Sequence, residues 1–273
     1  MNVLSLLVCF RFALRSAWLC CCLATLDCAT LCVRGQGTNT PAKLSPAARA
    51  RHDFVEARSR FQTNPTNSEI AWHFARACFD LAEFARNNSD RAEIAETGIS
   101  VARDLVSRVP NLAPGRYYLG MNLGQLARTK SLGALRLVDQ MEKEFLASQR
   151  LDPKFDYAGS DRNLGLLYLE APVIGSIGSR SKARSHLRRA VELAPDYPEN
   201  RLILIEAYTR WGDSMTAARE FRVLQENWSG YRKTFSGDKW EVSWSDWNTR
   251  FEKLKEQLSD HVGRLEMPRK TRP

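Results

Sequence analysis

The sequence predicts an all-α fold, a helical repeat array of about four helix pairs with a C-terminal capping helix. Apolar residues recur at spacings of three and four, as at Phe54, Ala57 and Phe61, which places them on one face of a helix. Prolines end successive apolar segments at intervals typical of a repeat, and these are Pro65, Pro110, Pro153 and Pro195. The alternating pattern of a strand is missing from the sequence, apart from a weak hint at residues 240–244.

Composition places the chain among ordinary globular proteins. It has 273 residues, of which 44% are hydrophobic and 26% charged, and this excludes wholesale disorder, collagen and a polytopic membrane protein. The formal net charge of +9 favours acidic partners or anionic surfaces, but the basic residues are too dispersed to indicate nucleic-acid binding.

Residues 1–35 are predicted to be a signal peptide or an N-terminal anchor. A largely apolar run at 17–26 follows Arg15, which suits the core of a signal peptide and is too short to span a bilayer comfortably. Six of the seven cysteines fall in this segment, and Cys22 is the candidate for lipid attachment. We therefore expect export to the periplasm or cell envelope, with a lipid anchor as one option. A mitochondrial-type presequence and a retained membrane anchor are the alternatives.

Residues 36–45 are predicted to be a flexible linker, because they are polar, contain proline and glycine and show no periodicity. The α-helical repeat domain then occupies residues 46–273. Its one cysteine, Cys78, lies among aromatic and aliphatic residues, so we expect a buried, unreactive thiol.

The prolines give the register of the repeats. An apolar residue lies nine positions after Pro65, Pro110 and Pro195, and eleven after Pro153. In the repeat motif, small side chains let the paired helices approach closely, and aromatic side chains fill the groove between neighbouring pairs. The residues assigned to this motif are Gly120, Leu164, Gly165, Tyr168, Ala190, Pro195 and Tyr208. Their spacing resembles the tetratricopeptide pattern W-x2-L-G-x2-Y, A-x3-F and P, so we expect a tetratricopeptide-like array.

Three of the predicted units are longer than a plain tetratricopeptide repeat. The first three carry about six to eleven additional residues between their two helices, around 83–91, 124–133 and 170–179. We interpret this length as loops on one side of the array, which would form a rim that binds something.

Residues 152–212 carry a narrower resemblance. It rests on the Gly-Ser-Asp-Arg block at 159–162, the Leu-Gly pair at 164–165, the Ala-Pro and Ile-Gly-Ser loop at 171–179 and the Asp-Tyr-Pro-Glu-Asn run at 196–200. These motifs are similar to those of the T-component family of TRAP-type transporter systems, helical-repeat proteins of the bacterial cell envelope. The resemblance implies a non-catalytic accessory component that assists a solute-binding partner. A eukaryotic family with similar helix pairs, the regulators of microtubule dynamics, implies the alternative, a membrane-anchored adaptor between proteins.

Five residues are candidates for contact with a ligand or partner, and these are Tyr157, Asp161, Arg162, Ile174 and Gly178. Arg162 lies at a predicted helix start, where free N–H groups and a guanidinium could hold a carboxylate or phosphate. The structural alternative is that Ser160 or Asp161 caps the helix and Arg162 pairs with an acid on the preceding helix. The glycines of residues 173–179 suggest a phosphate cradle, but the lysine and preceding strand of a P-loop are missing. This favours a loop that merely requires glycine dihedrals.

The aromatic residues near the C-terminus allow two interpretations. Seven lie between residues 228 and 251, and Trp247, Phe251, Leu254 and Leu258 fit one helical face, as in a capping helix. The alternative is a cleft for an apolar ligand or partner.

Catalytic and metal-binding constellations are missing from the sequence. The four histidines lie far apart, and no nucleophile–base pair, paired carboxylates or metal motif is found. We therefore expect no enzyme activity, no cofactor and no metal. The expected partner is a protein, such as a periplasmic solute-binding protein, or a small organic solute. Further copies of the chain and membrane association through the N-terminus are other options, and no nucleic acid is expected.

Overall fold

The computed structural model describes residues 44–130 and 133–266. Within these residues it consists of ten α-helices and one 3₁₀ turn, with no strand. The elements are α2 (Pro46–Thr63), α3 (Ser68–Ala82), α4 (Asn88–Arg108), α5 (Ala113–Ala127), α6 (Ala134–Leu151), α7 (Phe155–Glu170), α8 (Arg180–Leu193), α9 (Pro198–Arg210), α10 (Ser214–Thr234), η1 (Asp238–Trp240) and α11 (Glu241–Glu266). The predicted signal peptide or anchor at 1–35 and most of the linker at 36–45 lie outside the described residues. None of the described helices combines the length and the apolar character needed to cross a bilayer.

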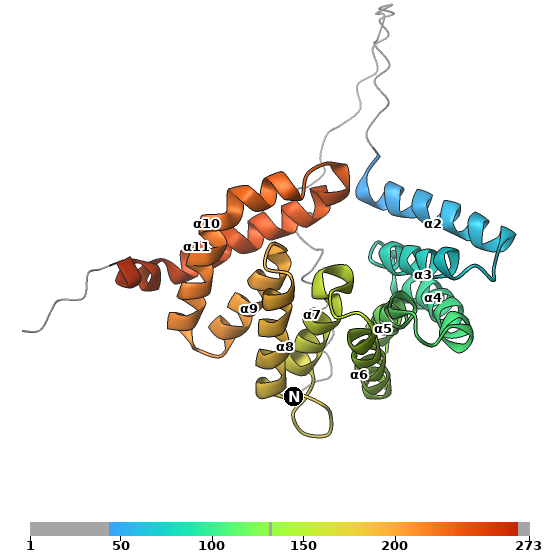
Figure 1. Ribbon diagram of the computed structural model, residues 1–273, viewed down its shortest axis with the longest axis horizontal. Helices are drawn as coiled ribbons and strands as arrows, with labels where there is room; N and C mark the ends of the chain where they lie inside the picture. Colours follow the sequence, from blue (N-terminus) through green and yellow to red (C-terminus); the bar gives the residue numbers. More distant parts are fainter. Residues whose placement is uncertain (1–43, 131–132, 267–273) are drawn as a thin grey trace, which may run out of the picture.

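The predicted array of four helix pairs is confirmed. Consecutive helices pack as pairs, α3 with α4, α5 with α6, α7 with α8 and α9 with α10, and each pair packs against the next (Figure 1). The first helices of successive pairs contact one another, so they lie on the inside of the curved array. α2 precedes the first pair and packs on α3, and α11 closes the last pair by packing on α9 and α10, as expected of a capping helix.

Polar caps and prolines begin the helices. Five N-cap side chains accept a hydrogen bond from a backbone N–H of the first turn, and these are Ser45, Asn67, Asn87, Ser179 and Asp213. α2, α5 and α9 carry proline in their first turn, where its missing N–H would have no intrahelical acceptor. The prolines that gave the register lie in the links that precede the first helix of each pair.

Two glycines mark the closest contacts within the helix pairs. A Cβ atom at Gly120 would lie 2.8 Å from Cε1 of Phe145, and one at Gly165 would lie 2.5 Å from Cδ2 of Leu187. In both pairs a glycine of the first helix faces a large side chain of the second. Four other motif residues are buried in the core: Leu164, Tyr168, Ala190 and Tyr208.

The additional length of the first unit is helical, which corrects its interpretation as a loop. The link between α3 and α4 is short, at residues 83–87, and α4 itself runs for 21 residues. The hint of a strand at 240–244 is also wrong, because a 3₁₀ turn ends at Trp240 and α11 begins at Glu241. Proline spacing fixes where a repeat ends, but it does not say whether added residues are helical.

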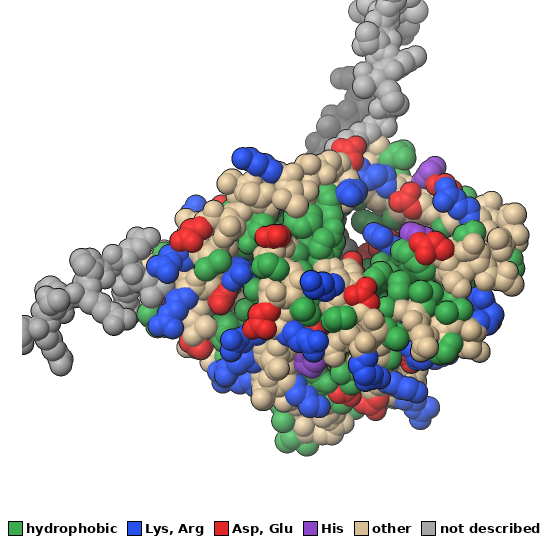
Figure 2. Space-filling view, in the orientation of Figure 1, with side chains coloured by type: hydrophobic (Ala, Val, Ile, Leu, Met, Phe, Trp, Pro, Cys, Tyr) green, Lys and Arg blue, Asp and Glu red, His purple; other side chains and the backbone are tan. Residues whose placement is uncertain are grey.

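The curved array brings its two ends together. Arg49, near the start of α2, forms an ion pair with Glu241 at the start of α11, with 3.3 Å between Nη2 and Oε2. The surface between α2 and the α10–α11 end is hollowed in the space-filling view (Figure 2). The start of α7 lies beside this hollow in the same orientation (Figure 1).

A buried ion cluster around Arg250 holds α11 against α9. The Arg250 guanidinium pairs with Glu199 at 2.7 Å, with Glu206 at 2.7 Å and with Asp246 at 3.0 Å. The predicted cap face, Trp247, Phe251, Leu254 and Leu258, is buried as well. Burial raises the pKa of Asp246 to about 6; Arg250 opposes this rise and Glu199 adds to it, since three carboxylates share one guanidinium.

The raised pKa of Asp246 predicts a pH dependence of stability. At pH values between 3.8, the ordinary pKa of an aspartate, and about 6, the folded state keeps a proton on Asp246 that the unfolded chain loses. The free energy of unfolding therefore falls as the pH rises through this window. We expect Asp246→Asn, which mimics the protonated acid, to match the wild type near pH 4. Near pH 7 the variant should be more stable by roughly 2–3 kcal/mol. Urea unfolding of the variant and the wild type near pH 4 and pH 7 measures this effect. The same difference in the free energy of unfolding at both pH values would contradict the prediction.

Candidate functional site

The first helix of the third pair begins with a left-handed turn. Asp156, Tyr157 and Ala158 have φ values of 51°, 55° and 60°, after which α7 continues as a right-handed helix. In the part of the chain that the structure describes, they are the only non-glycine residues with positive φ. A left-handed conformation costs about 1–2 kcal/mol per residue for L-amino acids, so neighbouring groups must hold this turn in place.

Arg162, a turn further along α7, holds the left-handed turn. Its Nη1 donates to the backbone carbonyls of Asp156 at 3.2 Å and Tyr157 at 3.3 Å, and its Nη2 donates to Oδ2 of Asp156 at 2.7 Å. The arginine is only 8% exposed. Burial acts against its charge, but Tyr117, Asp156, Tyr197 and Glu199 together raise the pKa of Arg162 above its ordinary value, so it stays protonated.

Side chains of the neighbouring pairs complete this support. Asn200, on α9, donates from Nδ2 to the Tyr157 carbonyl at 2.9 Å and accepts from Arg162 at 3.1 Å. Tyr117, on α5, donates its hydroxyl to Oδ2 of Asp156 at 2.5 Å. Burial, and then Asp156, raise the pKa of Tyr117, so it keeps the proton that it donates. Three successive pairs thus contribute to one turn.

The left-handed turn presents Tyr157 to an aromatic cavity. Tyr157 is 41% exposed, and its ring stacks on Tyr197 with 4.4 Å between centroids. Phe235 and Trp240 approach the same ring edge-on, with centroids at 5.5 and 6.1 Å. These four side chains line a cavity of about 380 Å³ between the start of α7, the α8–α9 link and the α10–α11 turn. Such a cavity suits an apolar or aromatic group.

Aromatic side chains continue from this cavity along the inner face to the first pair. Trp72 of α3 stacks on Tyr118 of α5 at 5.8 Å and meets Phe155 of α7 edge-on at 6.2 Å. Phe155 in turn directly precedes the left-handed turn. We define the aromatic band as Trp72, Tyr118, Phe155, Tyr157, Tyr197 and Trp240. It connects elements of all four helix pairs near the N-terminal ends of their first helices.

Charged side chains lie beside the aromatic band. Arg76 and Asp80, one turn apart on α3, pair at 3.5 Å and are each about half exposed. Burial by the surrounding protein raises the pKa of Asp80 to about 6, even though about half of its side chain is exposed. Arg76 opposes this rise, and Asp156 adds to it. The inner face therefore offers ion-pairing groups next to its aromatic rings.

The structure brings together two of the five predicted site residues, Tyr157 and Arg162. Asp161 is fully buried elsewhere on α7, where its Oδ1 accepts from Gln149 at 2.6 Å and lies 2.8 Å from Nδ1 of His186. The suggestion that Ser160 or Asp161 caps the helix is wrong, because both lie inside α7.

Ile174 and Gly178 lie in the α7–α8 link, at the opposite end of α7 from Tyr157. The right-handed part of α7, residues 159–170, separates them by about 18 Å. Ile174 is 93% exposed at the loop surface. At Gly178 a Cβ atom would lie 2.1 Å from the Ala171 carbonyl oxygen, and Gly175 has a φ of 79°, so both glycines serve the shape of the loop. Binding by this loop stays a prediction.

Cys78 has no part in the candidate site. It is buried, and burial raises the pKa of its thiol to about 12, so the thiol stays protonated and unreactive at neutral pH.

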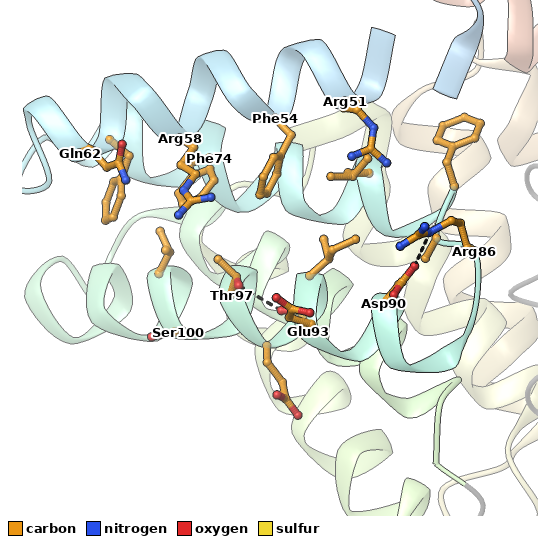
Figure 3. Close-up of a pocket in the computed structure, with 17 residues that line it drawn as sticks. Arg51, Phe54, Arg58, Gln62, Phe74, Arg86, Asp90, Glu93, Thr97 and Ser100 are labelled. Atoms are coloured by element: carbon orange, nitrogen blue, oxygen red, sulfur yellow. Dashed lines mark hydrogen bonds and ion pairs between the residues drawn. The ribbon is translucent and has the colours of Figure 1, made fainter. Parts of the chain in front are cut away.

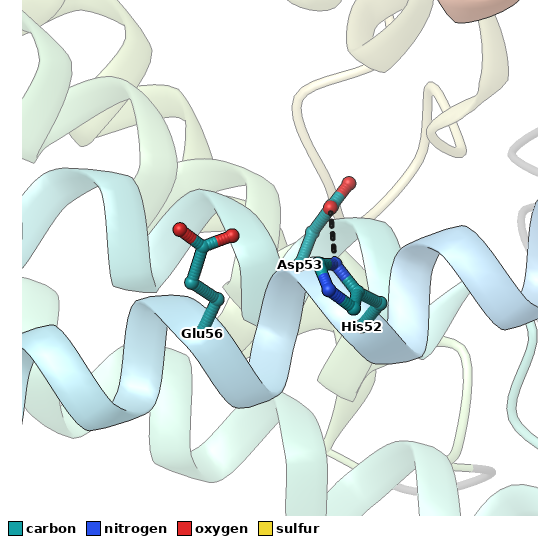
Figure 4. Close-up of side chains that lie close together, drawn as sticks. All are labelled: His52, Asp53 and Glu56. Atoms are coloured by element: carbon teal, nitrogen blue, oxygen red, sulfur yellow. Dashed lines mark hydrogen bonds and ion pairs between the residues drawn. The ribbon is translucent and has the colours of Figure 1, made fainter.

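Among the described residues, possible metal ligands gather at one place. His52, Asp53 and Glu56 on α2 offer ligand atoms within 4.8 Å of one another (Figure 4). The only signal in the sequence is the four-residue spacing of His52 and Glu56. All three side chains are exposed, and groups of this kind are common without an ion, so we assign no metal site here.

Comparison with known proteins identifies the fold. No protein-family model matches the sequence, and no curated protein matches it significantly. Among solved structures, the chain is similar to a thermophilic TPR protein of Thermus thermophilus, with 19% sequence identity and a TM-score of 0.56. The match covers 76% of this chain and 90% of that chain. The fold is therefore a tetratricopeptide-like repeat array, as the sequence predicts.

Proposed function

We propose that this protein is a non-catalytic scaffold that binds an extended segment of a partner protein along the aromatic band. The left-handed turn carries the proposal, because backbone strain of this kind clusters at functional sites. Here the strained turn positions Tyr157 at the cavity of about 380 Å³. One apolar side chain of the partner enters this cavity, and the rest of the segment lies across the partly exposed rings of Phe155 and Trp72.

A protein segment uses more of the inner face than a small solute would. The aromatic band connects all four helix pairs, whereas a small organic solute would fill the cavity alone. That cavity is near the lower end of the range for ligand pockets, about 300–1,000 Å³. A solute that binds without any protein partner would contradict this part of the proposal.

We also propose that the partner belongs to a TRAP-type transport system, for example a periplasmic solute-binding protein, and that the chain is exported. The support is the resemblance at 152–212, since its block at 159–162 and its run at 196–200 include Arg162 and Asn200, which hold the left-handed turn. N-terminal sequencing of the mature protein tests export. We expect a start close after Ala24 or Gly35, which are small residues at possible cleavage points of a signal peptide. An intact Met1 favours the membrane-anchored adaptor.

Tyr157→Ala and Trp240→Ala are each expected to weaken partner binding about tenfold or more, because aromatic side chains at pockets dominate such interfaces. The partner is captured with the wild-type chain, purified and titrated by calorimetry, with affinities expressed per folded molecule. Met215→Ala is the matched control, since it removes a partly exposed apolar side chain at the opposite end of α10. Equal affinities for the wild type and both aromatic variants would contradict binding along the aromatic band.

A further inference from the structure

The array carries a groove between α2 and α4 that the proposed function does not use. Its volume is about 820 Å³, against about 360 Å³ for the equivalent groove between α4 and α6. α2 and α4 form its two walls, and side chains from both point into the space between them (Figure 3). We call it the α2–α4 groove.

The floor of the α2–α4 groove is apolar. Phe54 and Phe61 of α2 lie against Phe74 of α3, with ring centroids at 5.5 and 5.3 Å, and Leu81 and Ile94 extend the same surface. Both α2 phenylalanines are only partly buried. α2 has a single buried residue, Ala50, so its apolar face is incompletely covered.

The α2 wall of the groove is basic. Arg51 and Arg58 alternate with Phe54 and Phe61 along one face of the helix and extend towards α4 (Figure 3). Within the described residues, neither arginine has a hydrogen-bond or ion-pair partner. The facing α4 wall carries Asp90, Glu93 and Glu96, of which Asp90 pairs with Arg86 at 2.8 Å, so the basic side of the groove is the one formed by α2. The two guanidinium groups are therefore available to an anionic occupant.

Other grooves of the same kind are closed by their own side chains. Arg103 of α4 donates to Oε1 of Gln140 on α6 at 3.1 Å, which bridges the α4–α6 groove. Between α6 and α8, Glu142 pairs with Lys182 at 3.7 Å. The α2–α4 groove is wider and carries no such bridge among the described residues, so it can admit a further element.

We propose that the α2–α4 groove binds an amphipathic helix of a second partner protein that is acidic along the side facing α2. Its apolar stripe packs on the phenylalanines of the floor, and its carboxylates pair with Arg51 and Arg58. The two arginines are seven residues apart, or about 10.5 Å along α2. A helix that lies alongside α2 matches this distance with acidic residues at positions i and i+7.

Charge and shape distinguish this occupant from the chain's own segments. Residues 1–43 contain four basic residues and one acid, Asp27, so they do not complement two arginines. A second copy fits no better, because the large exposed apolar side chains of the described residues are scattered and form no helical stripe. They are Leu44, Val55, Leu151, Tyr157, Val173, Ile174 and Met215.

Two designed fluorescent peptides test the proposal on the full chain. Each forms an amphipathic helix with a leucine and phenylalanine stripe, and one carries glutamate at flanking positions i and i+7 where the other carries lysine. Fluorescence anisotropy is expected to show that the glutamate peptide binds about tenfold more tightly, since charge complementarity sets the preference. The double variant Arg51→Glu/Arg58→Glu should reverse this preference. Arg60→Glu is the control, because Arg60 is exposed on the same helix but lies outside the groove, and it should leave the preference for the glutamate peptide unchanged.

Three results would overturn the proposal. The first is equal binding of the two peptides to the wild type, and the second is a preference that Arg51→Glu/Arg58→Glu leaves intact. The third is a dimer in sedimentation that this double variant dissolves, which would assign the groove to a second copy. Because both arginines are exposed and have no partner among the described residues, the variants should melt like the wild type, and this is checked before binding is measured.

Discussion

Gly165→Leu is expected to destabilise the protein by about 3 kcal/mol, which is a fall in melting temperature of roughly 6–12 °C. A Cβ atom at this position would lie 2.5 Å from Cδ2 of Leu187 and 3.2 Å from its backbone nitrogen. Because backbone as well as side chain is in the way, a rotamer change cannot relieve the clash, and α7 and α8 must move apart. Thermal melting followed by circular dichroism measures the effect.

Gly230→Ala is the matched control for this substitution. Gly230 also lies inside a helix, α10, but a Cβ atom there meets nothing within 4 Å. Alanine should therefore stabilise the helix by about 0.5–1 kcal/mol, because glycine is the poorer helix former. A melting temperature that Gly165→Leu leaves unchanged would show that the assigned repeat register is wrong.

Arg162→Ala is expected to cost about 3 kcal/mol of stability and to release the left-handed turn. The substitution leaves the Asp156 carboxylate without its cation and the carbonyls of Asp156 and Tyr157 without this donor. Breaking a buried ion pair costs about 3–5 kcal/mol, and the lower figure applies because the Asp156 side chain is 33% exposed. Arg162→Lys should recover part of the loss, since it restores the charge but not the planar fork of donors.

The same variant separates the two roles that the sequence allows for Arg162. Its hydrogen bonds are all to neighbouring groups of the chain, so we expect it to act by holding Tyr157 in place. Affinity per folded molecule should then fall to about the level of Tyr157→Ala, with helix content nearly unchanged. Lost binding without any loss of stability would show instead that Arg162 contacts the partner directly.

The repeat register could be predicted because a few residue types have fixed mechanical roles. Proline ends helices, and a small residue such as Gly165 permits close contact between the paired helices. The left-handed turn could not be predicted in this way. Asp156, Tyr157 and Ala158 have no strong preference for positive φ, and the side chains that hold them lie far along the chain. Tyr117 is 39 residues from Asp156, and Asn200 is 43 residues from Tyr157.

The aromatic band was missed for a related reason. Trp72 and Tyr118 each fit an ordinary helical core pattern, and only the packing of successive helix pairs stacks the ring of Trp72 on buried Tyr118. Trp240 lies in the C-terminal aromatic cluster, for which a cap and a cleft were both considered. The structure divides that cluster, since Trp247 is buried in the cap whereas Trp240 lines the cavity beside Tyr157.

Hydrogen–deuterium exchange of the chain with and without its purified partner tests binding along the aromatic band most directly. The first N–H groups of a helix have no intrahelical acceptor, so they exchange readily unless something covers them. We expect slower exchange in the complex at the starts of α3, α5, α7 and α9 and in the 3₁₀ turn Asp238–Trp240. Slower exchange confined to the second helices, or no change at all, would contradict the proposed function.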